Sequence, residues 1–265
     1  MYSKARLVFK WIKYFLSSSN GRGHGIHSPF TYQFVREVLM DRYPYSDYLN
    51  IETLRKKRSG DKRIISVSDP GAGSYGKNKS EKSVSDIAKH SLSSRKFGRL
   101  LYRISKFYNP GMIIELGSSL GISAAYLASA NDKANVLTME GDHSIAAIAV
   151  ENLKELGLDN VRVLNGNFDD LLPGVLETNP AANLVFIDGN HRKKSLLDYF
   201  EKITAHLALP ALIVIHDIHW SAEMEEAWAI IQADERVKLT IDIFSAGLVF
   251  FRDELKVRQK FVIRF

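Results

Sequence analysis

The 265-residue chain contains no cysteine. Disulfide bonds, thiolate metal sites and cysteine nucleophiles are therefore excluded, and a reducing compartment such as the cytoplasm fits the composition. The chain has no run of about 18 uncharged apolar residues, so we expect no membrane-spanning helix. The basic, aromatic start is not a typical signal peptide, because Lys10 and Lys13 interrupt its apolar run and no small-residue cleavage site follows.

Negative charge is scarce in the first part of the chain. Residues 1–110 hold 22 Lys and Arg against 8 Asp and Glu, a net charge of +14. Residues 111–265 hold 14 against 22, a net charge of −8, and the two parts give the overall net charge of +6. This asymmetry indicates that the two parts of the chain have different functions. The basic part either binds an anionic partner or only forms a solvated surface.

The first 90 residues predict a basic, mostly helical lobe for substrate recognition or for covering the site as a lid. Five apolar residues share one face of a helix expected over residues 2–16, namely Leu7, Val8, Trp11, Ile12 and Phe15. We expect this face to pack on the rest of the protein, with association with a membrane surface as the alternative. Further helices are expected over residues 32–40 and 84–108, a charge-dense connector over 55–63, and glycine-rich loops over 21–30 and 69–76.

Short apolar runs alternate with amphipathic segments beyond Pro110. The runs are Met112–Leu116, Val136–Met139, Val161–Leu164, Leu184–Ile187 and Leu212–Ile215. This alternation is typical of a parallel sheet, and near-continuous apolar strands fit a sheet covered on both faces. Two later runs, Val237–Ile243 and Leu248–Phe251, predict a closing antiparallel hairpin. We therefore expect an α/β catalytic domain over residues 91–265, after a lobe of residues 1–90.

Each of the five predicted parallel strands ends in glycine or polar residues. The five ends are Glu115–Gly121, Glu140–Asp142, Asn165–Phe168, Asp188–His191 and His216–His219. Ligands of open parallel sheets bind at the carboxyl ends of the strands, so five such ends in order predict a site.

The first of these ends indicates the class of ligand. Gly117 and Gly121 permit a tight turn and a close approach of a ligand to backbone N–H groups, or else only close packing of helix on strand. The spacing is neither that of dinucleotide enzymes nor that of a nucleotide-triphosphate loop. Glu140 ends the second strand, where a carboxylate can accept both hydroxyl groups of an adenosine ribose.

Residues Arg95 to Asp217 resemble class I S-adenosylmethionine-dependent methyltransferases, most closely the small O-methyltransferases related to catechol and caffeoyl-CoA O-methyltransferase. The matching elements are Gly98-Arg-Leu-Leu101 and the motif of residues Ile113 to Ala128, which reads IIELGSSLGISAAYLA. The resemblance implies a Rossmann-like, seven-stranded and mostly parallel sheet with an antiparallel last strand. The first 90 residues match no part of these families.

The resemblance also implies S-adenosylmethionine as the cofactor. It places Glu115, Gly117 and Gly121 around the methionine end and Glu140 at the ribose. Asn167 and Phe168 would lie near the adenine, unless they are ordinary turn and core residues. The full set of expected cofactor residues is Glu115, Gly117, Ser118, Ser119, Gly121, Glu140, Asn167, Phe168 and Asp188.

Catechol-type relatives bind a metal through an Asp after strand four and an Asp-Asn pair after strand five. Asp188 and Asp217 occupy the Asp positions, but Ile218 replaces the Asn and His219 follows it. The D-G-x-H and H-D strand ends also resemble those of sugar and macrolide O-methyltransferases. Asp188, Asp217 and His219 are thus the expected ligands of Mg²⁺ or another divalent cation.

A histidine base is the alternative to a metal. His191 or His216 could take the proton of the acceptor, since the pKa of histidine already lies near neutrality. The candidate catalytic residues are therefore Asp188, His191, His216 and Asp217.

The expected activity is methyl transfer from S-adenosylmethionine to an oxygen of a small, anionic acceptor. An RNA methyltransferase is an alternative, against which the lack of a recognisable RNA-binding module counts. A non-catalytic S-adenosylmethionine-binding protein is another, against which the presence of Asp188 and Asp217 counts. A homodimer is a further expectation.

Overall fold

The computed structural model describes residues 1–18, 28–68, 79–179 and 181–265. The chain divides into two compact units: a first unit of Met1–Asp41 with Leu176–Phe265, and a second unit of Arg42–Val175. The expected lobe of residues 1–90 contributes to both units, and its boundary stays a prediction. The glycine-rich loop over 69–76, and that over 21–30 up to residue 27, lie outside the described residues. None of the helices in the described ranges is long and apolar enough to cross a membrane.

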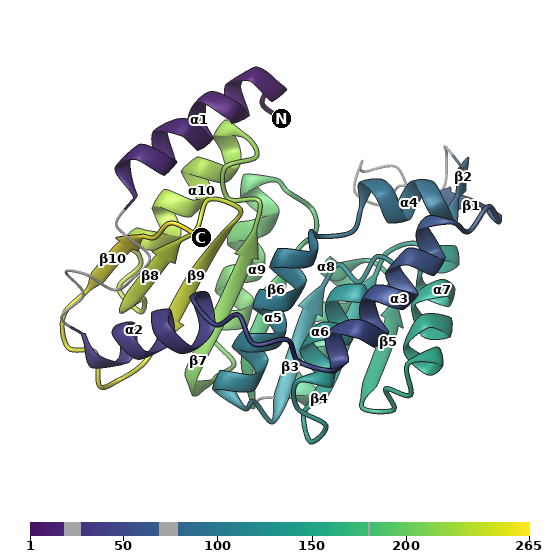
Figure 1. The fold of residues 1–265 in the computed structure, drawn as a ribbon. Helices are drawn as coiled ribbons and strands as arrows, with labels where there is room; N and C mark the ends of the chain where they lie inside the picture. The colour runs from purple at the N-terminus through teal and green to yellow at the C-terminus, as the bar shows by residue number, and fades with distance from the viewer. Residues whose placement is uncertain (19–27, 69–78, 180) are drawn as a thin grey trace. The chain divides into compact units, whose positions relative to one another are not determined.

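The main sheet is mixed, mostly parallel and eight-stranded, which confirms the predicted Rossmann-like α/β class (Figure 1). Its strands are β3 Met112–Leu116, β4 Asn135–Glu140, β5 Val161–Asn165, β6 Ala182–Ile187, β7 Leu207–His216, β8 Leu239–Asp242, β9 Ala246–Phe251 and β10 Gln259–Val262. Five of these strands, β3 to β7, overlap the predicted parallel runs, and β8 and β9 form the predicted hairpin. The strand β10 is an addition to the predicted seven.

The second unit holds β3, β4 and β5, which are parallel and adjacent in that order. Their register sets Glu115 opposite Thr138 and Glu140 opposite Asn165. Around them lie α3 Asp47–Ser59, α4 Val84–His90, α5 Arg95–Tyr108, α6 Ile122–Ser129 and α7 His143–Glu155. Because parallel strands point the same way, the polar residues that follow β3, β4 and β5 gather at one edge.

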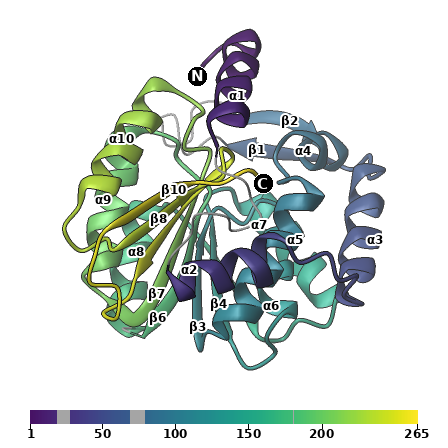
Figure 2. The same ribbon diagram turned by 60° about the vertical axis from the view of Figure 1, so that its left-hand side comes forward.

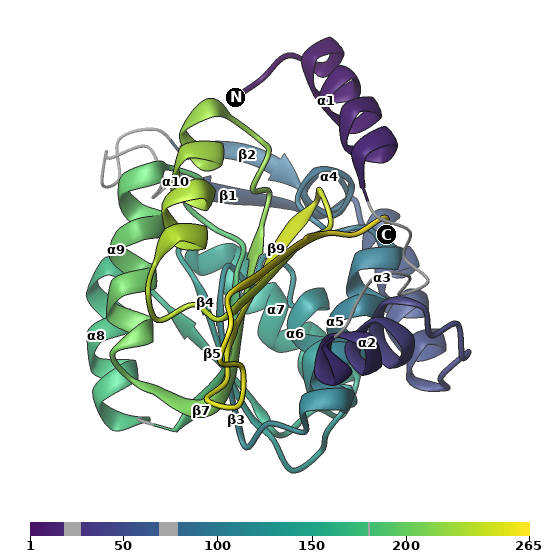
Figure 3. The same cartoon turned by 90° about the vertical axis from the view of Figure 1, so that its left-hand side faces the viewer.

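The first unit holds β10, β8, β9, β7 and β6 in that order. The strands β6 and β7 are parallel, and β9 runs antiparallel between β7 and β8. The helices α9 Lys193–Thr204 and α10 Ala222–Ala233 pack side by side (Figures 2 and 3). Every residue of β9 is buried, as expected for a strand covered on both faces. α8 Phe168–Thr178 runs from one unit into the other.

The charge-dense segment 55–63 was expected to be a connector, and this is wrong. The helix α3 continues to Ser59, because Tyr48, Ile51 and Leu54 recur at helical spacing on its buried side. Arg58 is also buried on this helix and donates to Glu151 and Glu155 of α7. Burial in ion pairs thus explains part of the positive charge of this segment.

A two-stranded hairpin lies in the segment that was expected to be mostly helical. β1 Ile64–Ser68 pairs with β2 Lys79–Ser83 in antiparallel register. Val67 of this hairpin joins a buried cluster with Val84, Leu120 and Ile148. The hairpin therefore supports the loop in which Leu120 lies, between β3 and α6.

Close packing explains the glycine of the GRLL element. Gly98 lies within α5, and a Cβ atom there would stand 2.4 Å from the ring of Tyr126 on α6. The Tyr126 side chain is buried and its hydroxyl donates to Glu52, so the ring has no room to retreat. This glycine serves the contact of α5 with α6.

The first helices belong to the first unit. They are α1 Lys4–Ser17, α2 Pro29–Phe34 and a π-helical turn, η1 Val35–Leu39. The apolar face of α1 was expected to pack on the protein, and this is wrong. Val8, Trp11, Ile12 and Phe15 are all exposed.

Candidate active site

The loop after β3 is fixed against β4 by backbone hydrogen bonds. The N–H groups of Gly117 and Ser118 donate to the carbonyl of Met139 at 3.0 and 2.9 Å. Gly121 takes φ +77° and leads into α6, and a Cβ atom there would lie 3.3 Å from Ala149. Ser119 takes φ +45° in the same loop. A left-handed turn therefore places the loop's backbone at the start of α6, where helix N–H groups attract electron-rich ligand atoms.

Glu140 lies at the end of β4, beside this loop. Its carboxylate accepts from the N–H of Ser119 at 2.9 Å and from the N–H of Asp142 at 3.0 Å. Burial raises the pKa of Glu140, and the backbone donors Asp142 and Ser119 lower it in part. The structure thus brings Glu140 together with Gly117, Ser118, Ser119 and Gly121, as the sequence predicted.

The end of β5 joins the same edge of the second unit. Asn165 donates to the carbonyl of Glu140 at 2.9 Å, and the N–H of Gly166 donates to it at 3.0 Å. Asn167 accepts from the N–H of Asp169 at 3.1 Å, which starts α8. Phe168 is half-buried at the first position of that helix. Asn167 and Phe168 therefore follow the strand next to Glu140.

Glu115 differs from the other expected cofactor residues because it is fully buried within β3. Thr138, its partner in the register, donates a hydroxyl hydrogen bond to the carboxylate of Glu115 at 2.5 Å. Ser118 is also buried and its hydroxyl lies 2.5 Å from that of Thr138. Glu115 thus lies beneath the loop and connects it to β4 through Thr138.

Asp142 has a role that the sequence analysis did not assign. Its carboxylate accepts from the N–H of Ile145 at 2.9 Å, capping α7. It also accepts from the N–H and the hydroxyl of Ser68 at 2.6 and 2.9 Å. Asp142 therefore links the end of β1 to the strand end that carries Glu140. The Asp at the start of a helical segment was visible in the sequence, but its distant partner was not.

A second group of polar residues lies at the ends of β6 and β7, in the first unit. One ligand atom from each of Asp188, His191 and Asp217 lies within 4.8 Å of the others. The His191 Nε2 atom is 3.8 Å from Asp188 and 3.9 Å from Asp217. His216 donates from Nδ1 to Asp188 at 2.8 Å. The four predicted catalytic residues thus converge in one cluster.

Two turns hold this cluster in place. Asn190 takes φ +52° between Asp188 and His191, and its side chain donates to Ser195 and Tyr199 of α9. Asp217 takes φ +56°, and its N–H donates to the carbonyl of Ser245 at 2.8 Å. Asp217 thus takes the left-handed conformation, which Asn and Asp adopt more readily than other L-residues.

Neighbouring charges set the protonation of the cluster. Burial alone lowers the pKa of His216, but the charge and hydrogen bond of Asp188, with the charge of Asp217, leave it raised above its ordinary value. Burial raises the pKa of Asp217, His216 and His191 oppose this, and Asp188 adds to it. Two carboxylates this close favour a positive partner, either a protonated imidazole or a metal ion.

His219 lies outside this cluster. Its Nδ1 atom is 2.9 Å from Glu225 and its Nε2 atom is 2.9 Å from Asp242. The ring also stacks on Phe244. Both nitrogens therefore serve a separate network with α10 and β8, and among the described residues His191 completes the three-residue group instead.

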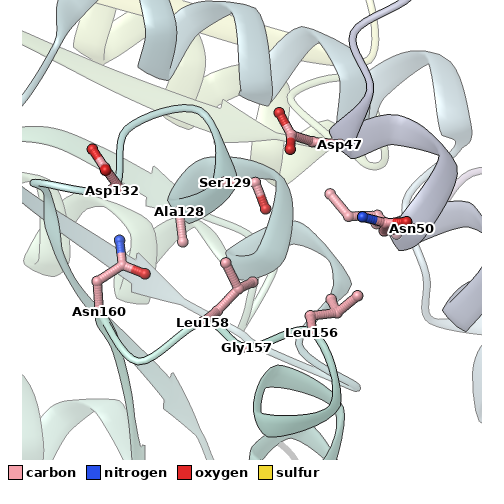
Figure 4. Close-up of a pocket in the computed structure, with 10 residues that line it drawn as sticks. Asp47, Asn50, Ala128, Ser129, Asp132, Leu156, Gly157, Leu158 and Asn160 are labelled. Atoms are coloured by element: carbon pink, nitrogen blue, oxygen red, sulfur yellow. The ribbon is translucent and has the colours of Figure 1, made fainter.

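A pocket of the second unit lies apart from these residues (Figure 4). It is lined by α3, the end of α6 and the segment before β5, through Asp47, Asn50, Ser129, Asp132 and Asn160 among others. The segment before β5 is the amino end of that strand, whereas the cofactor candidates lie at or after the carboxyl ends of their strands. This pocket therefore holds no expected site residue.

A parallel sheet with a left-handed loop after its first strand and a carboxylate ending its second is typical of S-adenosylmethionine-dependent methyltransferase domains. A family model described as a methyltransferase domain matches residues 114–218. This segment runs from β3 to just beyond Asp217. The chain belongs to the class I S-adenosylmethionine-dependent methyltransferases.

Individual relatives agree with this assignment. A tRNA (guanine-N(7)-)-methyltransferase from Mycoplasma mobile is 30% identical over 134 residues, which are 45% of this chain and 67% of that protein. The fold is similar to that of an O-methyltransferase from Bacillus cereus solved with SAH, with a TM-score of 0.57, 18% identity and coverage of 83% of this chain and 96% of that one. It is also similar to the O-methyltransferase TomG from Streptomyces achromogenes, solved with SAM, with a TM-score of 0.51, 20% identity and coverage of 61% and 82%.

Proposed function

We propose that this methyltransferase transfers the methyl group of S-adenosylmethionine to an oxygen of a small-molecule acceptor. The observation that carries the proposal is the convergence of Asp188, His191 and Asp217. A hydroxyl group must lose its proton as it is methylated, and this cluster offers either a cation site or a base for that purpose. Similar solved structures named O-methyltransferases support the choice of oxygen.

The proposal assigns the cofactor to the residues of the second unit. Gly117, Ser118, Ser119 and Gly121 would border the methionine end through their backbone, with Glu115 buried beneath them. Glu140 is assigned to the ribose hydroxyl groups, because a buried carboxylate is a strong acceptor for two neighbouring O–H donors. Asn167 and Phe168 are assigned to the adenine.

The proposal assigns a divalent cation to Asp188, His191 and Asp217. The donor set fits such an ion, because two carboxylates suit Mg²⁺ and an imidazole shifts the preference toward a transition metal such as Mn²⁺. The hydrogen bond from His216 would orient the Asp188 carboxylate as an outer-shell partner. A bound cation supplies Lewis acidity, which lowers the pKa of an acceptor hydroxyl.

A histidine base is the second candidate for the same cluster. The 2.8 Å hydrogen bond between His216 and Asp188 fixes one imidazole nitrogen, as in a carboxylate-oriented base. In that case the Nε2 atom of His216, or the partly exposed His191, would take the proton directly. The two candidates differ in one measurable property, the need for a metal ion.

We expect rigorous chelation to abolish methyl transfer to a hydroxylated acceptor, and added Mn²⁺ or Mg²⁺ to restore it. Binding of S-adenosylhomocysteine, measured in the same chelated sample, should be retained, because the loop of Glu115–Gly121 and Glu140 are not among the proposed metal ligands. Chelator loaded beforehand with the same cation is the control. Unchanged activity after chelation would reject the cation and leave His216 or His191 as the base.

An anionic small molecule remains the proposed acceptor, and RNA is not favoured. Ion pairs neutralise much of the positive charge of the charge-dense segment 55–63. Arg55 contacts Glu52, and Arg58 contacts Glu151, Glu155 and Asp61. The likeness to a tRNA methyltransferase covers under half of this chain. If positive charge attracts an anionic partner, it must therefore come from basic residues outside this segment.

A further inference from the structure

We propose that α1 is an interfacial helix that binds the surface of an anionic lipid bilayer. The helix exposes large apolar side chains over most of its length. Phe9 is 69% exposed and Leu16 is 76% exposed, so neither is covered by the described residues. The other exposed apolar side chains on this helix are Val8, Trp11, Ile12 and Phe15. A soluble protein rarely leaves so many large apolar groups together without a partner.

These side chains form one continuous face. At 100° per residue they span an arc of about 160°, from Trp11 to Phe9, broken only by Ala5 and by Lys4 at the N-terminal end. Trp11 and Phe15 stack on each other within this arc, with ring centroids 5.2 Å apart. An arc of this width is the shape of a helix that lies with one side in an apolar medium and the other in water.

The opposite side of α1 is fixed to the first unit, so the helix cannot turn to bury its apolar face. Tyr2 donates its N–H to the carbonyl of Trp220 at 3.0 Å and its hydroxyl to Glu225 at 2.8 Å. Lys10 donates to the same Glu225 at 2.8 Å. Tyr14 is buried and donates its hydroxyl to the carbonyl of Ile263. Figures 1 and 3 show α1 at the periphery of its unit.

The charge of α1 selects the kind of surface. The helix contains no acidic residue, and Lys4, Arg6 and Lys13 are exposed along it. Basic side chains next to an aromatic and aliphatic face match a bilayer with anionic headgroups, which they approach while the apolar groups enter the acyl boundary. The helix has 14 residues and is thus about 21 Å long, which is too short to cross the bilayer. It therefore lies on the surface.

A second copy of the chain fits this face less well. A twofold contact would bring together two helices that carry the positive charges of Lys4, Arg6 and Lys13, and no acidic residue of α1 would offset them. Like charges in such a contact oppose association. An anionic bilayer satisfies the apolar face and the basic residues together.

Hydrogen bonds connect the segment before α1 to the turn that carries Asp217. Tyr2, which precedes α1, donates its N–H to the carbonyl of Trp220, and the N–H of Trp220 donates to the carbonyl of Asp217 at 2.9 Å.

The test uses the full chain and sedimentation with vesicles of pure phosphatidylcholine or of phosphatidylcholine mixed with phosphatidylglycerol. We expect binding to the mixed vesicles that weakens as salt is raised. The Phe9→Ser/Leu16→Ser variant should bind at least about tenfold more weakly, because two apolar anchors are lost. The matched control is Leu49→Ser/Val257→Ser, which changes side chains that are 72% and 71% exposed outside α1 and should bind as the unaltered protein does.

A second variant, Lys4→Glu/Lys13→Glu, separates charge from apolar contact, and should lose the preference for phosphatidylglycerol. Three results would overturn the proposal. They are absence of binding to mixed vesicles, equal binding by the Phe9→Ser/Leu16→Ser variant, and a dimer in light scattering that this variant dissociates while no vesicle binding is seen. The last result would assign the face to a second copy of the chain.

Discussion

The Asp217→Asn variant is expected to transfer methyl groups at least about 100-fold more slowly than the unaltered protein. The substitution removes the negative charge that faces His191 at 3.9 Å and replaces the proposed carboxylate ligand by a weaker amide. The fold should persist, because asparagine tolerates the left-handed backbone that Asp217 adopts at φ +56°. Affinity for S-adenosylhomocysteine should change little, since Asp217 is not among the proposed cofactor residues. Single-turnover rates, combined with a binding titration, measure both quantities.

The matched control for this variant is Asp198→Asn. Asp198 is an exposed acid of α9, in the same unit, that contacts only Lys194 among the ion pairs found. It should keep the rate of the unaltered protein. If the Asp217→Asn variant transferred methyl groups as fast as this control, Asp217 would have no catalytic role, whether the cluster holds a cation or a base.

The Glu140→Gln variant is expected to bind S-adenosylmethionine about 10- to 100-fold more weakly, as the loss of hydrogen bonds to a charged acceptor predicts. Two effects add. The ribose hydroxyl groups lose a charged acceptor, and the amide –NH₂ must face one of the N–H groups, of Ser119 or Asp142, that the carboxylate accepts. The loop between β3 and α6 should then be held less firmly. Calorimetric titration gives the dissociation constant directly.

Glu177→Gln is the control for this second variant, because Glu177 is an exposed acid of α8. Both proteins should unfold at similar denaturant concentrations if Glu140 serves mainly the ligand. Unchanged affinity in Glu140→Gln would show that another group holds the ribose and that the loop tolerates an amide at this position.

The strands were predictable from the sequence because burial on both faces demands continuous apolar runs, as in Met112–Leu116 and Leu184–Ile187. The strand β10 was not, because Gln259–Val262 has only four residues, two polar ones followed by two apolar ones, and lies at the edge of the sheet, giving a short and weak pattern. The helix α3 was not expected, because its last turn is highly charged and its buried position there is Arg58, whose ion pairs come from residues far along the chain.

The site was predictable wherever strand ends alone decide the geometry. Asp188 and Asp217 follow adjacent parallel strands, and their convergence follows from that. The choice between His191 and His219 could not be made from the sequence. The ring of His219 contacts Asp242 of β8 and Glu225 of α10 instead of the cluster. Only the fold brings those two carboxylates to the ring.

Calorimetric titration of the unaltered chain with S-adenosylhomocysteine and, separately, with NAD tests the central claim most directly. We expect saturable binding of S-adenosylhomocysteine at a single site. We expect no binding of NAD, because the loop from Glu115 to Gly121 lacks the glycine spacing of dinucleotide enzymes. Binding of NAD without S-adenosylhomocysteine, or binding of neither, would contradict the assignment as a methyltransferase.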